Sequence, residues 1–319
     1  MEICIVGKGS IGLRHANIFL KLGCKVVLFR TYNSNIIIKK NPFVEISQFS
    51  KLKKRNISLV VICNPTSLHY KTFKKFSKIC KNFLIEKPIS NNLNELSLMQ
   101  SLIKNKKINI FSGYMMRFDP RIIKIKKILK KQKIIFSEFT WNTFLPHWHK
   151  YEDFREGYAF NSKLGGGVIK TCSHEIDLSL FFNGKVKETL SLEFPKKLGR
   201  DVEESVTLNL KHVNGNYSKI NLDFTNKIPR RDFKIFTNKF YIKWDFNNTY
   251  IEKKYYNKTK NKKISINYDL NNFYFDQNNF VLQNINRYKI RNFENLLNTE
   301  KTIHSSILSI KKNKIIKLN

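Results

Sequence analysis

The N-terminal part of the chain alternates short apolar runs with segments whose apolar residues recur at helical spacing. This alternation is typical of a parallel sheet with helices on both faces, because each crossover between parallel strands is usually helical. The predicted strands are Glu2–Val6, Lys25–Phe29, Leu59–Cys63, Asn82–Ile85 and Ile108–Ser112. The predicted helices are Ile11–Leu22, His69–Cys80 and Leu93–Lys104. The pattern therefore predicts a doubly wound α/β domain.

The pattern changes in the second half of the chain. After Asp119-Pro120 it predicts, in order, the helix Arg121–Lys131, the strand Ile134–Trp141, the loop Phe144–Phe160 and the helix Val168–Phe182. From Lys185 to about Tyr256 apolar and polar residues alternate with period two, which predicts antiparallel strands. The last part, from Leu270, is again helical in pattern.

These patterns predict a two-domain α/β protein. Residues 1–118 form the first domain, a doubly wound parallel sheet of the Rossmann type. Residues 119–319 form an α+β domain on a large, mainly antiparallel open sheet, which shapes the substrate site and mediates oligomerisation. We expect the C-terminal helices of this second part to pack back on the first domain.

Composition narrows the class of protein. None of the apolar runs approaches the roughly 18 residues that a membrane helix needs, and the first residues already belong to a strand rather than to a leader. The five cysteines contain no Cys-x-x-Cys pair and are typical of reduced core residues; Cys172 alone lies close to motifs discussed below. We therefore expect a cytoplasmic enzyme without membrane contact.

The formal net charge of +35 would by itself suggest a polyanion partner. However, lysine greatly outnumbers arginine, is spread over the whole length and is accompanied by abundant Asn, Ile and Phe. That composition is typical of drift in an AT-rich genome and favours a solvated lysine surface. Specific binding of nucleic acid remains the alternative, and we do not expect it.

A glycine turn joins the first strand to the first helix. In this turn, the first glycine permits a tight bend, the second admits a pyrophosphate and the third lets the helix pack on the strand. The helix N-terminus supplies N–H groups to the phosphates. The residues concerned are Gly7, Lys8, Gly9, Ser10, Ile11 and Gly12. They predict a nicotinamide dinucleotide site and hence an oxidoreductase.

The end of the second strand bears on the choice of cofactor. An acidic residue there usually binds the ribose hydroxyls of NAD, but this strand ends in Phe29, Arg30 and Thr31. The planar guanidinium of Arg30 suits a 2′-phosphate. We therefore predict NADP, with NAD as the alternative in which Arg30 stacks on adenine or faces solvent.

Further motifs follow in order along the chain. They are Val60-Val61-Ile62-Cys63-Asn64-Pro65-Thr66 with His69, Glu86-Lys87-Pro88, Gly113-Tyr114 with Arg117-Phe118, and Gly165-Gly166-Gly167 followed by His174 and Asp177. Together they resemble the Gfo/Idh/MocA family, named after glucose–fructose oxidoreductase and inositol dehydrogenase. The resemblance covers residues 1–185 by motif and the later sheet by pattern only.

The resemblance implies roles for several residues. Asn64, Pro65 and Thr66 would line the nicotinamide side of the cofactor with His69 nearby, and Glu86 and Lys87 would lie beside its ribose. Lys87 and His174 would act on a substrate carbinol or carbonyl. A base must take the hydroxyl proton as hydride leaves, while an ammonium stabilises alkoxide character.

The sequence departs from the family at Lys170. Many members carry an aspartate four residues before the histidine, which completes a set of Lys, Asp and His. Here a cation replaces that carboxylate. Either the proton takes another route, for instance through Asp177 or a substrate group, or hydride transfer has been lost.

The loop before the triple glycine is rich in aromatic and charged residues, Leu145–Arg155. It looks like a substrate loop of family members associated with sialic-acid-like and other surface sugars, since aromatic faces pack on sugar C–H groups and charged groups bind hydroxyls or carboxylates. Two alternatives remain: a structural loop, or a zinc site formed by His147, His149 and Glu152. We predict no metal.

The sequence thus predicts an NAD(P)-dependent oxidoreductase acting on a sugar or nucleotide-sugar derivative in surface-glycan metabolism. The alternative is a dinucleotide-binding but catalytically degenerate regulatory or assembly protein of such a pathway. We expect a homo-oligomer, a dimer or tetramer. The predicted substrate-binding residues are Tyr114, Arg117, Trp148, His149, Arg155, Lys170, His174 and Asp177.

Overall fold

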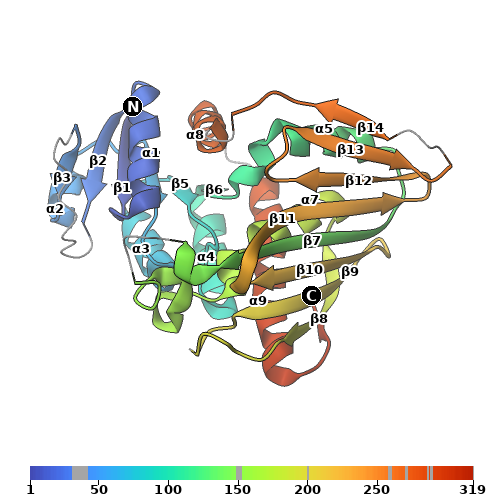
Figure 1. The fold of residues 1–319 in the computed structure, drawn as a ribbon. Coiled ribbons are helices and arrows are strands. Elements are labelled where there is room, and N and C mark those ends of the chain that lie inside the picture. Colours follow the sequence, from blue (N-terminus) through green and yellow to red (C-terminus); the bar gives the residue numbers. More distant parts are fainter. Residues whose placement is uncertain are drawn as a thin grey trace. The chain divides into compact units, whose positions relative to one another are not determined.

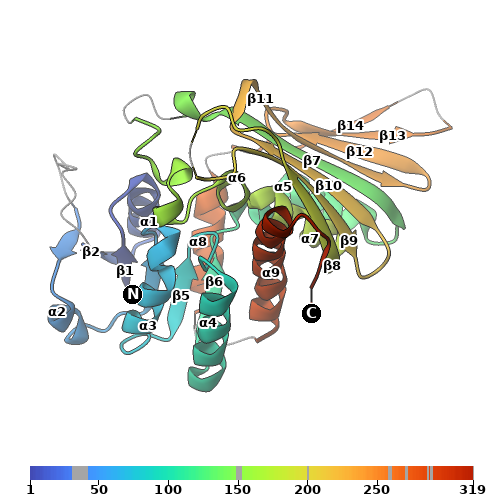
Figure 2. The same ribbon diagram turned by 90° about the horizontal axis from the view of Figure 1, so that it is seen from below.

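The computed structural model of the chain describes residues 1–30, 42–148, 153–199, 201–257, 261–269, 272–285, 287 and 290–318. The chain divides into two compact units, the first made of Met1–Met115 and Asn271–Leu297, and the second of Met116–Leu270 and Asn298–Asn319 (Figures 1 and 2). The long helix α9 (Ile290–Lys312) contributes residues to both units. Among the described residues, no helix combines the length and apolar character that a bilayer crossing requires.

A six-stranded parallel sheet forms the centre of the first unit. Its strands, in order across the sheet, are β3 (Val44–Ile46), β2 (Lys25–Phe29), β1 (Glu2–Val6), β4 (Leu59–Ile62), β5 (Asn82–Ile85) and β6 (Asn109–Ser112). Its helices are α1 (Ser10–Lys21), α2 (Phe49–Lys53), the 3-10 helix η1 (Thr66–Leu68), α3 (His69–Phe76), α4 (Leu93–Lys106) and α8 (Phe273–Gln283). The predicted Rossmann sheet is confirmed, with β3 as an additional edge strand.

Successive residues of each strand in this unit face opposite sides of the sheet. Ile3 and Ile5 of β1 pack in one core cluster with residues of α1 and α8, whereas Cys4 and Val6 pack in another with residues of α3 and α4. Because helices cover both faces, the strands are apolar at nearly every position rather than at every second one.

A nine-stranded sheet forms the centre of the second unit. Its strands, in order across the sheet, are β14 (Lys262–Ser265), β13 (Tyr250–Tyr255), β12 (Phe240–Asp245), β11 (Thr225–Thr237), β7 (Ile134–Phe144), β10 (Tyr217–Asp223), β9 (Ser205–His212), β8 (Val186–Glu193) and β15 (Ile316–Lys317). The pair β7 and β10 is parallel and the other pairs are antiparallel. The predicted mainly antiparallel sheet is therefore confirmed.

Helices cover one face of this sheet. They are α5 (Pro120–Leu129), α6 (Val168–Thr171) and α7 (His174–Asn183), and short 3-10 helices occur at η2 (Met115–Phe118), η3 (Leu145–His147), η4 (Tyr158–Phe160) and η5 (Ser162–Leu164). The segment 168–182, predicted as one helix, is two, because the backbone of Cys172 leaves the helical conformation at φ −94°, ψ 25°. His174 is consequently the first residue of α7.

The opposite face of the sheet carries a row of aromatic side chains. Tyr217, Phe136, Phe236 and Tyr241 are direct neighbours on β10, β7, β11 and β12. Phe139 and Phe233 pair in the same strands and pack toward α7, where Phe182 contacts Phe233 with ring centroids 5.3 Å apart. Phe136 and Phe236 are three residues away from that pair, so the alternation of strands places them on the other face. We call these four residues the aromatic row.

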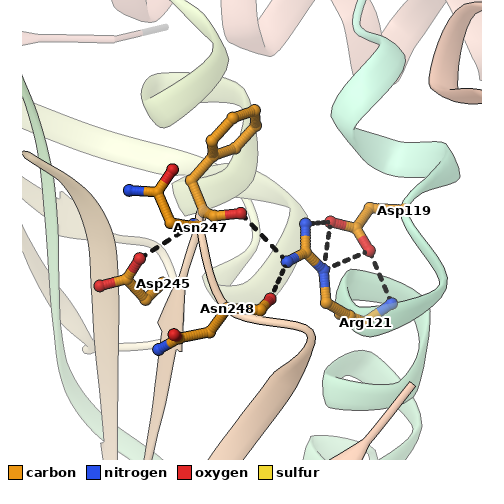
Figure 3. Close-up of polar contacts among 6 residues, drawn as sticks. Asp119, Arg121, Asp245, Asn247 and Asn248 are labelled. Atoms are coloured by element: carbon orange, nitrogen blue, oxygen red, sulfur yellow. Dashed lines mark hydrogen bonds and ion pairs between the residues drawn. The ribbon is translucent and has the colours of Figure 1, made fainter. Parts of the chain in front are cut away.

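A buried ion pair fixes the start of α5 (Figure 3). The Asp119 carboxylate caps the helix by accepting from the Arg121 backbone N–H at 2.7 Å, and it also accepts from the Arg121 guanidinium, whose Nη2 lies 2.7 Å away. The same guanidinium donates to the carbonyl oxygens of Phe246 and Asn248 in the turn between β12 and β13. Arg121 therefore joins α5 to this turn by hydrogen bonds that satisfy a buried charge.

Candidate functional site

The glycine turn of the first unit shows a different requirement at each glycine. Gly7 has φ +109°, and a Cβ on it would lie 2.8 Å from the backbone of Cys63 and Asn64. A Cβ on Gly12 would lie 2.1 Å from the Gly7 carbonyl oxygen. A Cβ on Gly9 would meet no atom of the described residues within 4 Å. Packing within the unit therefore requires Gly7 and Gly12, whereas Gly9 borders open space.

The open space at Gly9 lies at the N-terminus of α1. Gly9 is the N-cap residue, no side chain in the described part of the chain caps the helix, and its first turn contains no acidic residue. The first N–H groups of a helix, here those of Ser10, Ile11 and Gly12, have no partner within the helix. An uncapped helix end with free N–H groups and positive dipole character suits a phosphate. The turn thus fits the pyrophosphate of a dinucleotide.

The two cationic side chains near the glycine turn, those of Lys8 and Arg30, both form ion pairs. Lys8 Nζ lies 2.8 Å from Glu45 Oε1, and the Arg30 guanidinium forms an ion pair with Glu45 Oε2. A carboxylate therefore exists beside Arg30, although it comes from β3 and not from the end of β2. Thr31, the other residue predicted at this position, lies outside the described residues.

Asn64 and His69 support the segment that follows β4. The Asn64 amide donates to Thr72 Oγ1 at 2.8 Å, while its buried Oδ1 has no hydrogen-bond partner among the described residues. The His69 ring lies between the carbonyl oxygens of Asn64 and Pro88, at 2.8 and 2.9 Å. Burial lowers the pKa of His69, against the opposing effect of these carbonyls. The ring therefore holds backbone in place, and Asn64 Oδ1 is the atom that suits a ligand donor.

Pro65 and Thr66 complete this segment. Pro65 is the N-cap residue of η1, and Thr66 is its first residue and is buried. Their backbone follows the carboxyl end of a central parallel strand, which is where ligands bind in open α/β sheets.

The Glu-Lys-Pro motif follows β5, with a cis peptide bond between Lys87 and Pro88. Glu86 Oε1 lies 2.9 Å from Nε2 of the buried His15, and His15 Nδ1 lies 3.0 Å from Asn278 Oδ1 on α8. Burial alone would raise the pKa of Glu86, but the His15 hydrogen bond and the charges of His15 and Lys87 lower it below its ordinary value. The Glu86 carboxylate therefore fixes the backbone beside Lys87 through contacts inside the unit.

The Gly113-Tyr114 motif requires glycine at its first position because the Glu86 carboxylate lies against it. A Cβ on Gly113 would lie 2.6 Å from the Glu86 carboxylate, so any larger residue would displace it. The adjacent Tyr114, predicted to bind substrate, is 3% exposed and belongs to the core cluster that contains Cys4 and Val6.

In the second unit, His174 lies in a stacked group of side chains. Its ring stacks on Trp141 with centroids 6.3 Å apart and an interplanar angle of 28°. The Arg231 guanidinium lies 3.8 Å from the Trp141 ring centroid, and its Nε donates to Glu175 Oε1 at 2.7 Å. Trp148 also contacts Trp141, with centroids 5.9 Å apart. Trp141 therefore brings together the predicted residues His174 and Trp148.

Arg117 and Asp177 form a second pair of predicted residues. The guanidinium donates twice to the carboxylate at 2.7 Å, and Thr299 Oγ1 donates to Asp177 Oδ1 at 3.2 Å. Asp177 is buried, whereas the Arg117 side chain is 31% exposed. Both carboxylate oxygens of Asp177 bind the Arg117 guanidinium, so Asp177 orients Arg117.

Lys170 lies in the last turn of α6, near a carboxyl group that sequence reasoning missed. Glu203 Oε1 accepts from the Ile169 N–H at 3.3 Å, and a Cβ on Gly167 would lie 2.5 Å from the same oxygen. Burial raises the pKa of Glu203 to about 7, against the lowering effects of backbone hydrogen bonds and the charge of Lys170. A carboxyl group thus lies within electrostatic reach of Lys170.

The remaining predicted residues are less informative. Arg155 is exposed and contacts Asp153 at 3.5 Å. His149 and Glu152 lie outside the described residues, so the zinc alternative stays untested. Among the residues that the structure describes, no group of three or more His, Cys, Asp or Glu side chains could hold a metal ion.

A hollow of about 650 Å³ in the first unit lies away from the predicted residues. It is lined by residues at the amino ends of the strands, among them Met1, Ser58 and Asn82. The glycine turn follows the carboxyl end of β1 and is therefore at the other edge of the sheet. Neither the glycine turn nor the Glu-Lys-Pro motif contributes to this hollow.

Comparison with known proteins agrees with this geometry. Residues 1–114 match the GFO_IDH_MocA family model, described as an oxidoreductase family with an NAD-binding Rossmann fold. The chain is 32% identical over 79 residues to the uncharacterized oxidoreductase YrbE of Bacillus subtilis, covering 25% of this chain and 23% of that protein. It is 24% identical over 149 residues to the inositol 2-dehydrogenase of Rhizobium meliloti, covering 45% and 43%. The chain thus matches less than half the length of either relative.

The fold is shared over a longer span. The structure of a levoglucosan dehydrogenase, in complex with NADH and levoglucosan, superposes with a TM-score of 0.83 at 13% identity and covers 99% of both chains. At this identity the likeness concerns the fold alone. Together with the family match over residues 1–114 and the inositol dehydrogenase relative, it confirms the predicted resemblance to the Gfo/Idh/MocA family, whose NAD-binding Rossmann fold residues 1–114 match.

Proposed function

We propose that this chain transfers a hydride between a nicotinamide dinucleotide and a carbinol or carbonyl carbon of a sugar or sugar derivative. The observation that carries the proposal is the uncapped N-terminus of α1 behind Gly9, where open space faces free N–H groups. The buried Oδ1 of Asn64, which lacks a hydrogen-bond partner among the described residues and lies at the carboxyl end of the neighbouring strand β4, supports it. Both features suit ligand groups that the described protein atoms do not replace.

The catalytic roles follow from the chemistry of the side chains. When bound, the nicotinamide ring accepts or returns the hydride. We assign His174 as the base that takes the carbinol proton, because imidazole exchanges protons near neutral pH. The Lys87 ammonium stabilises negative charge on the substrate oxygen. Glu86, fixed by His15, accepts from the Lys87 backbone N–H at 3.2 Å, and Trp141 supports the ring of His174.

The substrate class is proposed from the second unit. Trp148 and Trp141 provide aromatic surface suited to sugar C–H groups, and Arg117, oriented by Asp177, provides a cation with partial exposure. Two of the similar proteins are an inositol 2-dehydrogenase and a levoglucosan dehydrogenase. The partly exposed Arg117 favours an acidic or nucleotide-linked sugar, and we place this sugar in a surface-glycan pathway, as the sequence predicts.

Two finer assignments belong to this proposal. Arg30 favours NADP over NAD, because its guanidinium suits a 2′-phosphate. The aromatic row supports a homo-oligomer, because these rings are partly exposed on a sheet face that none of the described helices covers, and such a row suits burial against a second copy.

The test is a turnover assay with purified protein, NADH or NADPH formation being followed by fluorescence with a panel of polyols, sugars and nucleotide sugars. We expect activity with at least one member, lost by about 100-fold or more in Lys87→Ala and His174→Ala. Lys104→Ala, an exposed lysine on α4 outside the proposed site, serves as the control and should retain activity. Dinucleotide binding without turnover, unchanged in both variants, would instead support the catalytically degenerate alternative that Lys170 suggests.

A further inference from the structure

Three charged residues meet at the carboxyl end of the first strands. Lys8 lies between the first two glycines of the turn and its side chain is only 5% exposed. Arg30 directly follows β2, and its side chain is 38% exposed. Glu45, the central residue of β3, forms an ion pair with each of them. The Glu45 carboxylate therefore forms ion pairs with two cations.

The order of strands brings these residues together. β1, β2 and β3 are parallel neighbours, with Val6 paired to Phe29 and Phe29 paired to Ile46. The Arg30 N–H donates to the Ile46 carbonyl at 3.1 Å, which extends the pairing past the end of β2. The residues that follow parallel strands meet at one edge of a sheet, so the side chains of Lys8, Arg30 and Glu45 converge there.

The carboxylate is firmly ionised. The hydrogen bond from Lys8 lowers the pKa of Glu45, with the positive charges of Lys8 and Arg30 acting in the same direction against partial burial. At neutral pH the three groups therefore sum to one positive charge. Without Glu45 the same site would present two unopposed cations.

The charges of these three groups determine which cofactor the site favours. A phosphate monoester carries about −1.5 to −2 charges at neutral pH. It would be attracted by Lys8 and Arg30 but repelled by Glu45, and it must compete with Glu45 for the Arg30 guanidinium. A ribose with free hydroxyls meets no such repulsion and can donate hydrogen bonds to a carboxylate.

We propose that Glu45 sets the cofactor selectivity of this chain by holding Lys8 and Arg30 and opposing the 2′-phosphate of NADP. The inference rests on the proposed dinucleotide site. The selectivity residue is thus a carboxylate supplied by the edge strand β3, and it limits the preference for NADP that Arg30 alone would give.

The test measures the dissociation constants of NADPH and NADH by fluorescence titration of the wild-type protein and of Glu45→Gln. We expect Glu45→Gln to bind NADPH about tenfold more tightly or better, while NADH binding changes by less than about threefold. Raising the salt concentration should reduce the gain, because exposed charges are screened. Arg30→Ala added to Glu45→Gln should remove most of it.

Two control variants make the result specific. Glu45→Asp keeps the charge and should keep the wild-type ratio of the two constants. Glu2→Gln removes a carboxylate that pairs with Arg55 at the amino end of β1, and it should leave both constants unchanged. Melting temperatures of all variants show whether each one folds.

Distinct outcomes would overturn the proposal. An unchanged NADPH constant in folded Glu45→Gln would overturn it, as would weaker NADH binding with no gain for NADPH, because Glu45 would then bind ribose hydroxyls directly. If the wild-type protein bound neither dinucleotide at millimolar concentration, the proposed function itself would fail, and this result is distinguishable from the other two.

Discussion

Arg117 and Asp177 are joined by two parallel hydrogen bonds of 2.7 Å, and the carboxylate of this pair is 1% exposed. Both residues are proposed to belong to the substrate site, yet the carboxylate is fully occupied by Arg117 and Thr299. The pair therefore contributes to stability as well as to recognition. Replacing the buried carboxylate and replacing the partly exposed guanidinium should have different effects.

Asp177→Asn should destabilise the protein, because it leaves a partly buried guanidinium without its counter-charge. We expect a loss of about 2–4 kcal/mol in the free energy of unfolding, measured by urea denaturation. Arg155→Gln breaks the exposed contact with Asp153 and should cost less than about 0.5 kcal/mol. Equal losses in the two variants would contradict this assignment.

The glycine turn allows stability and binding to be separated. Gly12→Ala should lower the free energy of unfolding by about 1–3 kcal/mol, since its Cβ would lie 2.1 Å from a backbone oxygen. Gly9→Ala should leave stability within about 0.5 kcal/mol, because Gly9 has φ −72° and open space beside it. It should nevertheless weaken NADH binding by about tenfold or more. Undiminished NADH binding by Gly9→Ala would place the pyrophosphate elsewhere.

Trp141 should affect catalysis through His174. We expect Trp141→Leu to lower kcat by about tenfold or more while NADH binding stays unchanged, because the imidazole loses the ring on which it stacks. Trp141→Phe keeps an aromatic platform and should restore most of the activity. The pH dependence of kcat, recorded for all three proteins, distinguishes a displaced base from a general loss of structure, which would leave the profile unchanged.

Glu203 should give the protein a pH-dependent stability. Burial raises the pKa of Glu203 from its ordinary 4.5 to about 7, so ionisation of this carboxyl group costs free energy in the folded state. This cost is absent below pH 4.5, grows between pH 4.5 and 7, and is constant above. Glu203→Gln should therefore become more stable than the wild type as pH rises through this window, by up to about 3 kcal/mol. Urea denaturation at several pH values measures the difference, and a pH-independent difference would refute the expectation.

The aromatic row should control the oligomeric state. Replacing both Phe136 and Tyr217 by Glu places charges in the middle of the proposed interface, and we expect the oligomer to dissociate. Light scattering coupled to size-exclusion chromatography measures the mass. Leu98→Glu replaces an exposed leucine on α4 of the first unit and should leave the mass unchanged. A wild-type monomer, or a double variant of unaltered mass, would exclude this interface.

Much of the fold could be predicted because local patterns determine it. The strands β1, β2, β4 and β5 are buried apolar runs flanked by turn residues, and the glycine turn follows β1 directly. By contrast, β3 is only three residues long, too short for a recognisable alternation. The division between α6 and α7 also escaped prediction, because Cys172 and Ser173 carry no helix-breaking signal.

The site was predictable where residues carry a motif and unpredictable where they act through distant contacts. Gly9 and Asn64 are recognisable from their neighbours in sequence. Glu45 is not, because it reaches Lys8 across 37 positions of sequence. His15 likewise meets Glu86 across 71 positions, and only the strand order reveals that contact. Sequence reasoning therefore missed the carboxylate that accompanies Arg30.

The helix α9 has a consequence for the order in which the protein is made. Val281 of α8 and Phe293, Leu296 and Leu297 of α9 belong to the two core clusters of the first unit, although they are encoded near the end of the chain. Translation normally lets an N-terminal domain fold as it emerges. Here the core of the nascent Rossmann unit stays incomplete until the segment that contains these four residues has left the ribosome. During that interval the apolar residues that these side chains cover stay exposed, and such surface makes folding intermediates prone to aggregate.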